Sequence, residues 1–384
     1  MRRAQAMWSD ESGAGATIAA SRPEPQRKSM SARRPKIGLA LGAGAARGWC
    51  HIGVLREFEA AGFKPDIVAG TSIGALVGGC YAAGELDAIE RFARSLSRRR
   101  VLSLLDLSFS GGGLFSGARL RDKLELALAG KTIENVAIPF AAVATEISTG
   151  HEIWLRSGRL ARALNASYAM PGLLEPVMVD GRWLFDGALV NPIPVSVCRA
   201  LGADMVVAVN LVSDSMFRGT VIGDRNIGDE TTSMVAEKVE QAGARSWIAG
   251  VASPTALLKR RLRRNSNDGP GVASVMLDAF SITQDRIARS RLAGDPPDVL
   301  INARLEQFGL FDFHRAADMI ALGREIARRR LPDILEHVSG AARAEEVRLV
   351  VHELVGGGDR APHVAPPGAH GVGLDGARLL RMTV

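Results

Sequence analysis

Apolar runs and apolar residues at helical spacing alternate along the chain from residue 36 onward. Residues 36–41 (KIGLAL) predict a strand, and residues 51–58 carry mainly apolar side chains at intervals of three and four, which predict a helix. The pattern then repeats, because residues 66–69 predict a second strand and residues 73–83 a second helix. Strand, helix, strand, helix at this spacing is typical of a parallel sheet with helices on its faces.

The alternation continues and supports one large α/β domain. Further strands are predicted at residues 140–145, 152–155, 176–179, 205–211 and 298–301, and further helices at 160–168, 194–201 and 314–330. The expected fold class is therefore α/β, with a central, mostly parallel sheet and helices on both faces.

The domain boundaries follow from where this pattern starts and fades. Residues 1–35 are predicted to be a disordered extension, in which Met30 is a candidate for the native start. Residues 36–335 form the predicted domain, with a core at 36–212 and a C-terminal part at 213–335. Residues 336–384 are predicted to be a C-terminal helix and a disordered tail.

Residues 273–287 are amphipathic and lie downstream of a basic cluster at residues 259–264. Their apolar positions near one face are Val275, Met276, Ala279, Ile282 and Thr283. Two interpretations stay open: a helix that packs on the sheet through this face, or a lid or membrane-touching element.

Composition adds limits on compartment and class. The chain has 384 residues, 47% of them hydrophobic, yet no apolar stretch approaches the about 20 residues that cross a bilayer. The first 30 residues lack the apolar core of a secretory signal, and the three cysteines are widely spaced within apolar stretches. These features predict buried thiols and a cytoplasmic location, with peripheral contact at a membrane as an extension of it.

The net charge is +7, with further arginine clusters at residues 98–100 and 328–330. Such clusters either attract phosphates, as on an anionic membrane surface, or form solvated faces. Aromatic residues do not interleave with them, so no nucleic-acid partner is predicted.

The strongest chemical signal is the sequence Gly-Thr-Ser-Ile-Gly at residues 70–74, between a predicted strand and a predicted helix. This is the context in which G-x-S-x-G forms a tight turn that exposes the serine hydroxyl, here Ser72. Small flanking glycines, Gly70 and Gly74, let a substrate carbonyl approach. Taken alone, the same residues also suit an ordinary helix N-cap.

Two other segments carry candidate chemistry. Residues 41–48 (LGAGAARG) form a small-residue loop after the first strand, where backbone N–H groups can hold an anion. They do not fit the dinucleotide pattern G-x-G-x-x-G, because Arg47 occupies the last glycine position and Gly48 comes one residue late. Asp186, with Gly187 and Ala188, follows the apolar run 183–185 and is placed to project from a strand end, although an ordinary turn aspartate fits too.

Together these motifs, in this order, resemble the patatin-like phospholipases. The loop at 42–48 resembles their oxyanion loop, residues 70–74 their nucleophile elbow, and residues 186–188 their catalytic Asp-Gly-Ala/Gly. Similar to bacterial members are also the stretches 51–55 (HIGVL), 169–172 (AMPG), 191–195 (NPIPV) and 311–316 (FDFHRA). The resemblance spans residues 36–330.

The resemblance implies a three-layer sandwich and a serine acyl hydrolase that cleaves fatty-acyl esters of lipids through an acyl-enzyme. Ser72 is the implied nucleophile and Asp186 the implied base, without a catalytic histidine. The implied oxyanion donors are the N–H groups of Gly42, Ala43, Gly44 and Ala45, and the supporting motif residues are Arg47, Gly48, Gly70, Gly74 and Gly187. A lipid substrate at an anionic membrane surface is the expected partner, and no cofactor or metal is expected.

One departure from the family pattern concerns the oxyanion loop. Ala43 and Ala45 stand where the family more usually has glycine. Alanine keeps the N–H donor but restricts φ, so the loop requires that these positions avoid positive φ.

Two other function classes remain open. An α/β-hydrolase triad needs a histidine after the aspartate, for which His314 is the first candidate, followed by His337 and His352. A non-catalytic lipid-binding or regulatory protein is the third reading. His51 lies on the apolar stripe of the first predicted helix and is expected to be a structural residue, whereas Arg47 either orients the loop, binds a headgroup phosphate or holds loop carbonyls.

Overall fold

The computed structural model describes residues 34–104, 115–211 and 272–356, and from residue 342 onward it describes the backbone alone. The predictions for the N-terminal extension, the basic cluster at 259–264 and the tail beyond 356 lie outside these residues.

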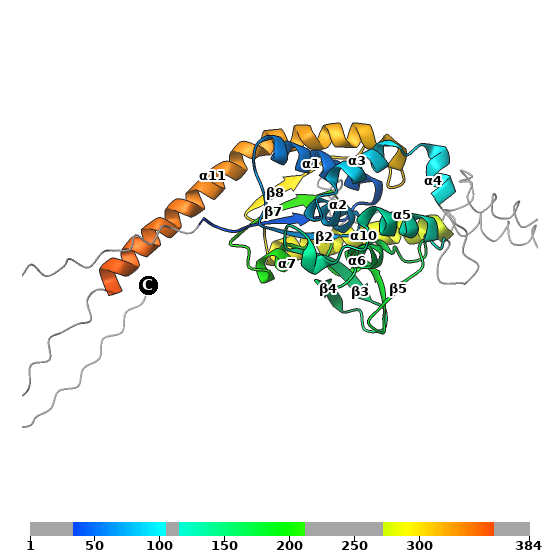
Figure 1. Ribbon diagram of the computed structural model, residues 1–384, viewed down its shortest axis with the longest axis horizontal. Helices are drawn as coiled ribbons and strands as arrows, with labels where there is room; N and C mark the ends of the chain where they lie inside the picture. The colour runs from blue at the N-terminus through cyan, green and yellow to red at the C-terminus, as the bar shows by residue number, and fades with distance from the viewer. Residues whose placement is uncertain (1–33, 105–114, 212–271, 357–384) are drawn as a thin grey trace, which may run out of the picture.

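A single eight-stranded sheet forms the centre of the molecule (Figure 1). Its strands are β1 (Ile37–Leu41), β2 (Ile67–Thr71), β3 (Phe140–Glu146), β4 (Glu152–Leu155), β5 (Val177–Val179), β6 (Arg182–Asp186), β7 (Met205–Asn210) and β8 (Val299–Asn302). The order is β5-β6-β3-β2-β1-β7-β8, and β4 pairs with β3. Neighbouring strands are parallel along the row β3-β2-β1-β7-β8. In contrast, β4 and β6 pair antiparallel with β3, and β5 pairs antiparallel with β6.

The central strands β1, β2, β3 and β7 are buried at every position, as expected for a parallel sheet covered on both sides. One face packs against α1 (Trp49–Ala60), α2 (Ile73–Ala82), α3 (Leu86–Arg94), α5 (Ala118–Leu128), α6 (Leu160–Tyr168) and α11 (Ala316–Gly356). The other face packs against α7 (Val195–Ala200) and α10 (Val272–Gly294). The predicted α/β class, with helices on both faces of a mostly parallel sheet, is confirmed.

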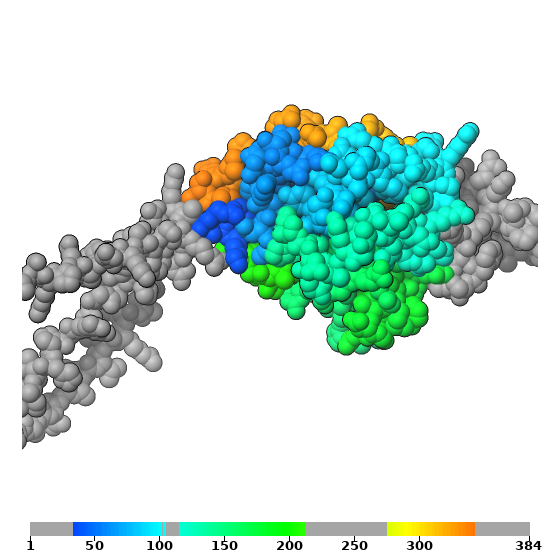
Figure 2. Space-filling view, viewed as in Figure 1, coloured from blue at the N-terminus to red at the C-terminus, as the bar shows by residue number. Residues whose placement is uncertain are grey.

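Helices cover the centre of the sheet, whereas its antiparallel end is partly exposed. In the space-filling view, the residues of the first helices make one continuous surface, and the green segment that contains β5 and β6 lies uncovered at the lower edge (Figure 2). Cys50, Cys80 and Cys198 are free and buried in these layers.

Some elements differ from the sequence prediction. The segment 86–128, for which no element was predicted, contains α3, α4 (Arg98–Leu104) and α5. The helix predicted at 314–330 and the C-terminal helix predicted beyond residue 335 form one element, because α11 runs without interruption from Ala316 to Gly356. Within the described residues, no helix is both long and apolar enough to cross a membrane.

The amphipathic segment forms α10, but it does not pack through the predicted face. Val275, Met276, Ala279, Ile282 and Thr283 are all exposed. The helix instead packs through the opposite face, where Gln284 and Ala288 are buried.

The arginine cluster in α11 is engaged with carboxylates. Arg328 Nε donates to Glu57 Oε1 at 2.7 Å and Arg330 pairs with Asp333 at 2.8 Å, while Arg329 pairs with Glu325. This cluster is therefore part of an ion-paired helix surface.

Candidate active site

Ser72 and Asp186 come together because two strands end head to head on the same edge of β3. On one edge of β3, Val143 pairs with Thr71 of β2, and the next residue, Ala144, pairs with Asp186 of β6. The opposite edge is occupied by β4. Because β2 is parallel and β6 antiparallel to β3, the residue after β2 and the last residue of β6 meet. Ser72 Oγ donates to Asp186 Oδ2 at 2.5 Å.

Ser72 occupies a strained turn between β2 and α2. Its backbone has φ 58° and ψ −125°, a conformation that residues with a side chain rarely adopt. The turn also needs glycine on both sides. A Cβ at Gly70 would lie 2.5 Å from Ala75 Cα, and one at Gly74 would lie 2.1 Å from Leu41 O.

Asp186 is fully buried, with 0% of its surface exposed. Its Oδ1 accepts the N–H of Ala188 at 2.9 Å, and its own N–H donates to Ala169 O at 2.9 Å. Burial raises the pKa of Asp186 to about 7, although the hydrogen bonds from Ser72 and Ala188 act to lower it. Gly187 allows this packing, because a Cβ there would lie 2.3 Å from Val143 O. The carboxyl group thus has the pKa of a base for neutral pH.

Ser167, which the sequence analysis did not single out, holds the nucleophile turn in place. Its hydroxyl accepts the N–H of Ser72 at 3.0 Å and donates to Val143 O at 2.6 Å. The residue is fully buried at the end of α6. Its place two residues before the AMPG stretch was the available signal, but serine at a helix end has many ordinary explanations.

The loop after β1 offers fewer free donors than the sequence suggested. The N–H of Gly42 donates to Val209 O at 3.0 Å, and that of Ala43 donates to Pro192 O at 2.9 Å. Across the described parts of the chain, the N–H groups of Gly44 and Ala45 have no hydrogen-bond partner. These two donors are therefore the ones available to an anion.

Ala45 does not meet the expectation that the alanines of this loop avoid positive φ. Its φ is 50°, whereas Ala43 is not among the residues with positive φ. Left-handed backbone costs a non-glycine residue about 1–2 kcal/mol. The loop therefore holds its shape against a local strain.

His51 and Arg47 hold the oxyanion loop in place through hydrogen bonds to backbone carbonyls. His51 is fully buried, and its Nε2–H donates to Gly42 O at 2.8 Å, because a carbonyl only accepts. Burial lowers the pKa of His51 to about 4, so the ring is neutral. Arg47 Nε donates to Phe308 O at 3.0 Å. Gly48 packs against Ile73, since a Cβ there would lie 2.2 Å from that side chain.

Two of the three histidines considered for a triad lie away from the pair in the described structure. His314 Nε2 accepts a hydrogen bond from Arg98 Nε at 3.2 Å, and His337 Nδ1 lies 2.8 Å from Asp333 O. The side chain of His352 lies outside the described part. Among the side chains described, no histidine contacts Ser72 or Asp186.

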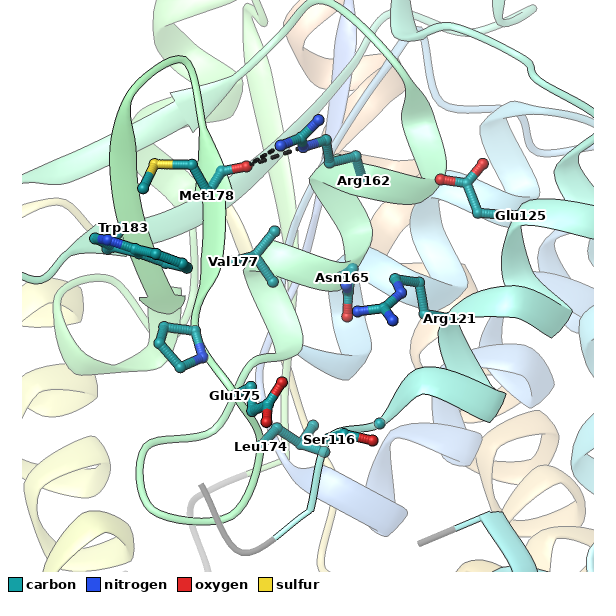
Figure 3. Close-up of a pocket in the computed structure, with 12 residues that line it drawn as sticks. Ser116, Arg121, Glu125, Arg162, Asn165, Leu174, Glu175, Val177, Met178 and Trp183 are labelled. Carbon is teal, nitrogen blue, oxygen red and sulfur yellow. Dashed lines mark hydrogen bonds between the residues drawn. The ribbon is translucent and has the colours of Figure 1, made fainter. Parts of the chain in front are cut away.

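Two cavities flank α5. The larger, of about 380 Å³, lies between α5, α6, β5 and β6, and Arg121 and Asn165 point towards each other in it (Figure 3). Neither Ser72 nor Asp186 lines it, so it lies apart from the pair. The smaller, of about 80 Å³, is mainly apolar and includes Leu76, one turn beyond Ser72 in α2, and Tyr168, which follows Ser167.

No group of three or more His, Cys, Asp or Glu side chains within the described ranges is placed to hold a metal ion. The polar atoms of Ser72 and Asp186 are hydrogen-bonded to each other, to backbone groups and to the hydroxyl groups of Ser167 and Thr145. The chemistry that this arrangement can perform is proton transfer from a serine hydroxyl to a buried carboxylate.

The chain is similar in sequence to known proteins. Residues 39–199 match the family described as patatin-like phospholipase. An uncharacterized NTE family protein of Mycobacterium tuberculosis is 33% identical over 353 residues, which cover 81% of this chain and 96% of that protein. Human patatin-like phospholipase domain-containing protein 6 is 33% identical over 194 residues, 49% of this chain and 14% of that protein.

Among solved structures, VipD from Legionella pneumophila aligns with a TM-score of 0.43 and 15% identity, covering 79% of this chain and 68% of that one. Human GIVD cytosolic phospholipase A2 aligns with a TM-score of 0.34 and 12% identity, over 81% of this chain and 60% of that one. The identity and coverage shared with the mycobacterial protein decide the relationship. The chain belongs to the patatin-like phospholipase family, a family of lipid acyl hydrolases.

Proposed function

We propose that the chain hydrolyses fatty-acyl esters of lipids with Ser72 as nucleophile and Asp186 as its base. The observation that carries this proposal is the 2.5 Å hydrogen bond from Ser72 Oγ to the buried Asp186 carboxylate. A general base works best when its pKa lies near the operating pH, and burial raises the pKa of Asp186 to about 7. Ionisation of this base makes the rate of acylation rise as the pH passes upward through about 7.

The reaction runs in two halves. Ser72 Oγ attacks the ester carbonyl carbon while its proton passes to Asp186 Oδ2, and the tetrahedral intermediate then breaks the bond to the alcohol oxygen. Asp186 returns the proton to that oxygen, which leaves an acyl ester on Ser72. Water attacks this ester and gives its proton to Asp186. The released fatty acid leaves Ser72, which regains the proton from Asp186.

The negative charge on the carbonyl oxygen needs donors that are free and fixed. The N–H groups of Gly44 and Ala45 are the candidates in this loop, because those of Gly42 and Ala43 already donate to Val209 and Pro192. The N-terminus of α2 adds a partial positive charge beside Ser72. Removing one donor from such an oxyanion hole lowers the rate on the order of 100-fold or more.

The apolar cavity beside α2 is the candidate place for the acyl chain. It begins at Leu76, whose N–H donates to Ser72 O at 3.1 Å, and it continues to Tyr168, next to Ser167. Both walls are thus directly connected to the nucleophile turn.

The test compares hydrolysis of a p-nitrophenyl acyl ester and a fluorogenic phospholipid by five proteins. These are the wild type and the variants Ser72→Ala, Asp186→Asn, His314→Ala and Asp180→Asn. Ser72→Ala and Asp186→Asn are expected to lower kcat/KM at least about 1000-fold, as loss of members of a catalytic unit does. His314→Ala tests the triad, and Asp180→Asn is the matched control, because Asp180 is an exposed aspartate in the turn before β6.

The outcomes separate the function classes. Loss in the first two variants with near-wild-type rates in the other two supports the dyad. A comparable loss in His314→Ala, with the fold intact by circular dichroism, would replace the dyad by a triad. A wild type that binds lipid but turns over neither ester would favour a binding or regulatory protein instead.

A further inference from the structure

The first half of α10 exposes apolar side chains. Val275, Met276 and Ile282 are 47%, 51% and 61% exposed, and Ala279 between them is exposed too. At 3.6 residues per turn these positions lie opposite Gln284 and Ala288, which are buried. α10 therefore packs against the protein through one face, and its opposite, apolar face is exposed to solvent for about two turns.

This outward face lies beside the proposed active site. α10 packs against η3 (Gly187–Leu189), the short helix that directly follows Asp186. Met276 lies over the loop after α6, because a Cβ at Gly172 would be 2.9 Å from Met276 Cε. The same loop contains Ala169, whose carbonyl accepts the N–H of Asp186.

The position of α10 in the whole molecule agrees with these contacts. The parallel strands point towards the end of the molecule at which α10 begins (Figure 1). Ser72 follows one of these strands directly. The apolar face and the carboxyl ends of the strands therefore lie at one end.

We propose that the face formed by Val275, Met276, Ala279 and Ile282, here called the α10 apolar face, inserts into the surface of the lipid aggregate that carries the substrate. This inference rests on the proposed function, since an acyl hydrolase must take a poorly soluble lipid out of a bilayer or micelle. Apolar side chains on a helix enter the boundary between headgroups and acyl chains when basic residues flank them. Arg286, exposed on the same face one turn beyond Ile282, lies where headgroup phosphates would be.

The size of the face favours a lipid surface over a second protein. A stable protein interface buries about 800 Å² on each partner. Four small or medium side chains over two helical turns provide much less, whereas insertion into lipid needs no matching surface and gains free energy for each apolar group that enters.

Binding to vesicles is measured in a Ser72→Ala background, so that no lipid is consumed. The probes are sucrose-loaded vesicles of phosphatidylcholine, with and without phosphatidylglycerol, followed by sedimentation. Val275→Gln combined with Ile282→Gln removes the centre of the face and leaves Met276, which touches the loop, unchanged. The matched control is Leu335→Gln in α11, where the replaced side chain is 44% exposed.

The double variant is expected to bind vesicles about tenfold more weakly than the parent and the Leu335→Gln control, since two half-exposed apolar side chains no longer enter lipid. With Ser72 restored, hydrolysis of vesicle phospholipid should fall by a similar factor, while hydrolysis of a soluble short-chain ester stays within about twofold. Stronger binding to the vesicles that contain phosphatidylglycerol, and loss of this difference in Arg286→Gln, would support a contact between Arg286 and the lipid phosphates.

Unchanged vesicle binding in the double variant would overturn the proposal. If the double variant also lost self-association in size-exclusion chromatography, the face would instead belong to a contact between copies of the chain. Vesicle binding is read without turnover, so a wild type that hydrolyses no ester leaves this test intact while it refutes the proposed reaction.

Discussion

The nucleophile turn (residues 70–74) and the oxyanion loop (residues 42–48) follow neighbouring strands, but different forces shape them. The nucleophile turn is fixed mainly by close packing, because a side chain at Gly70 or Gly74 would meet backbone atoms at 2.5 and 2.1 Å, and one hydrogen bond from the Ser72 N–H to Ser167 supports it. The oxyanion loop is fixed by hydrogen bonds to other segments. Gly42 and Ala43 donate to Val209 O and Pro192 O, and Ala46 donates to Leu310 O.

The difference shows which part of the site tolerates change. A hydrogen-bonded loop can carry an unfavourable residue, and Ala45 with φ 50° is such a residue. The close-packed turn also contains a strained residue, Ser72, but it cannot accept a side chain at Gly70 or Gly74, because the neighbours there are backbone atoms that have nowhere to move. The two regions also depend on each other, since the atoms nearest to Gly74 are the carbonyl oxygens of Leu41 and Gly42, where the oxyanion loop begins.

Gly74→Ala is expected to have the largest effect on stability. Its Cβ would lie 2.1 Å from Leu41 O and 2.6 Å from Gly42 O, so α2 and the oxyanion loop would have to move apart. We expect the free energy of unfolding to fall by about 4 kcal/mol or more, with loss of esterase activity in any protein that remains folded. Urea denaturation followed by circular dichroism measures the first effect.

Gly78→Ala is the matched control, one turn further along α2. A Cβ there would meet the ends of Leu41 and Val68 side chains at 3.0 Å, and alanine is the better helix former by about 1 kcal/mol. The control is expected to stay close to the wild type. Equal destabilisation by the two variants would mean that close backbone approach is not what fixes the nucleophile turn.

Asp186→Asn is expected to remove activity but to stabilise the fold at alkaline pH. An unfolded aspartate loses its proton near pH 3.9, whereas burial raises the folded pKa to about 7. Between these values the native state keeps a proton that the unfolded chain has released, so the free energy of unfolding falls as the pH rises, by up to about 4 kcal/mol. Asparagine has no such proton to lose.

The variant should therefore be more stable than the wild type at pH 8 and about equal to it near pH 4. Urea denaturation of both proteins at a series of pH values measures this difference. A difference that does not grow between pH 4 and pH 8 would contradict a raised pKa at Asp186.

The sequence predicted the elements of the fold better than their pairing. The strands at 152–155 and the helix at 160–168 coincide with β4 and α6, because continuous apolar runs and helical spacing are local signals. The antiparallel pairing of β6 with β3, which brings Asp186 to the end of β2 and so to Ser72, depends on the register between distant segments. Only the resemblance to a family linked these two residues beforehand.

The candidate site shows the same limit. Motif spacing indicated residues 42–45 as donors, but it could not show that the N–H groups of Gly42 and Ala43 are taken by Val209 and Pro192. Ser167 was missed for a similar reason, because its role arises from a contact 95 residues away in sequence. The exposed side of α10 was also not predictable, since an apolar face alone does not say whether protein or lipid covers it.

Ala45→Gly is expected to have the smallest effect and addresses the oxyanion loop directly. Glycine relieves the left-handed strain at φ 50°, worth about 1–2 kcal/mol, but it loses more chain entropy on folding, about 0.5–1 kcal/mol. The net gain in the free energy of unfolding is therefore between about 0 and 1.5 kcal/mol, and the N–H donor remains. The measurement compares the acylation rate of Ala45→Gly with that of the wild type. A donor held by the hydrogen bonds around it keeps its position whether residue 45 is alanine or glycine. A rate within about threefold of the wild type supports that account of the loop. A loss of 100-fold would mean instead that the alanine side chain itself holds the donor in place.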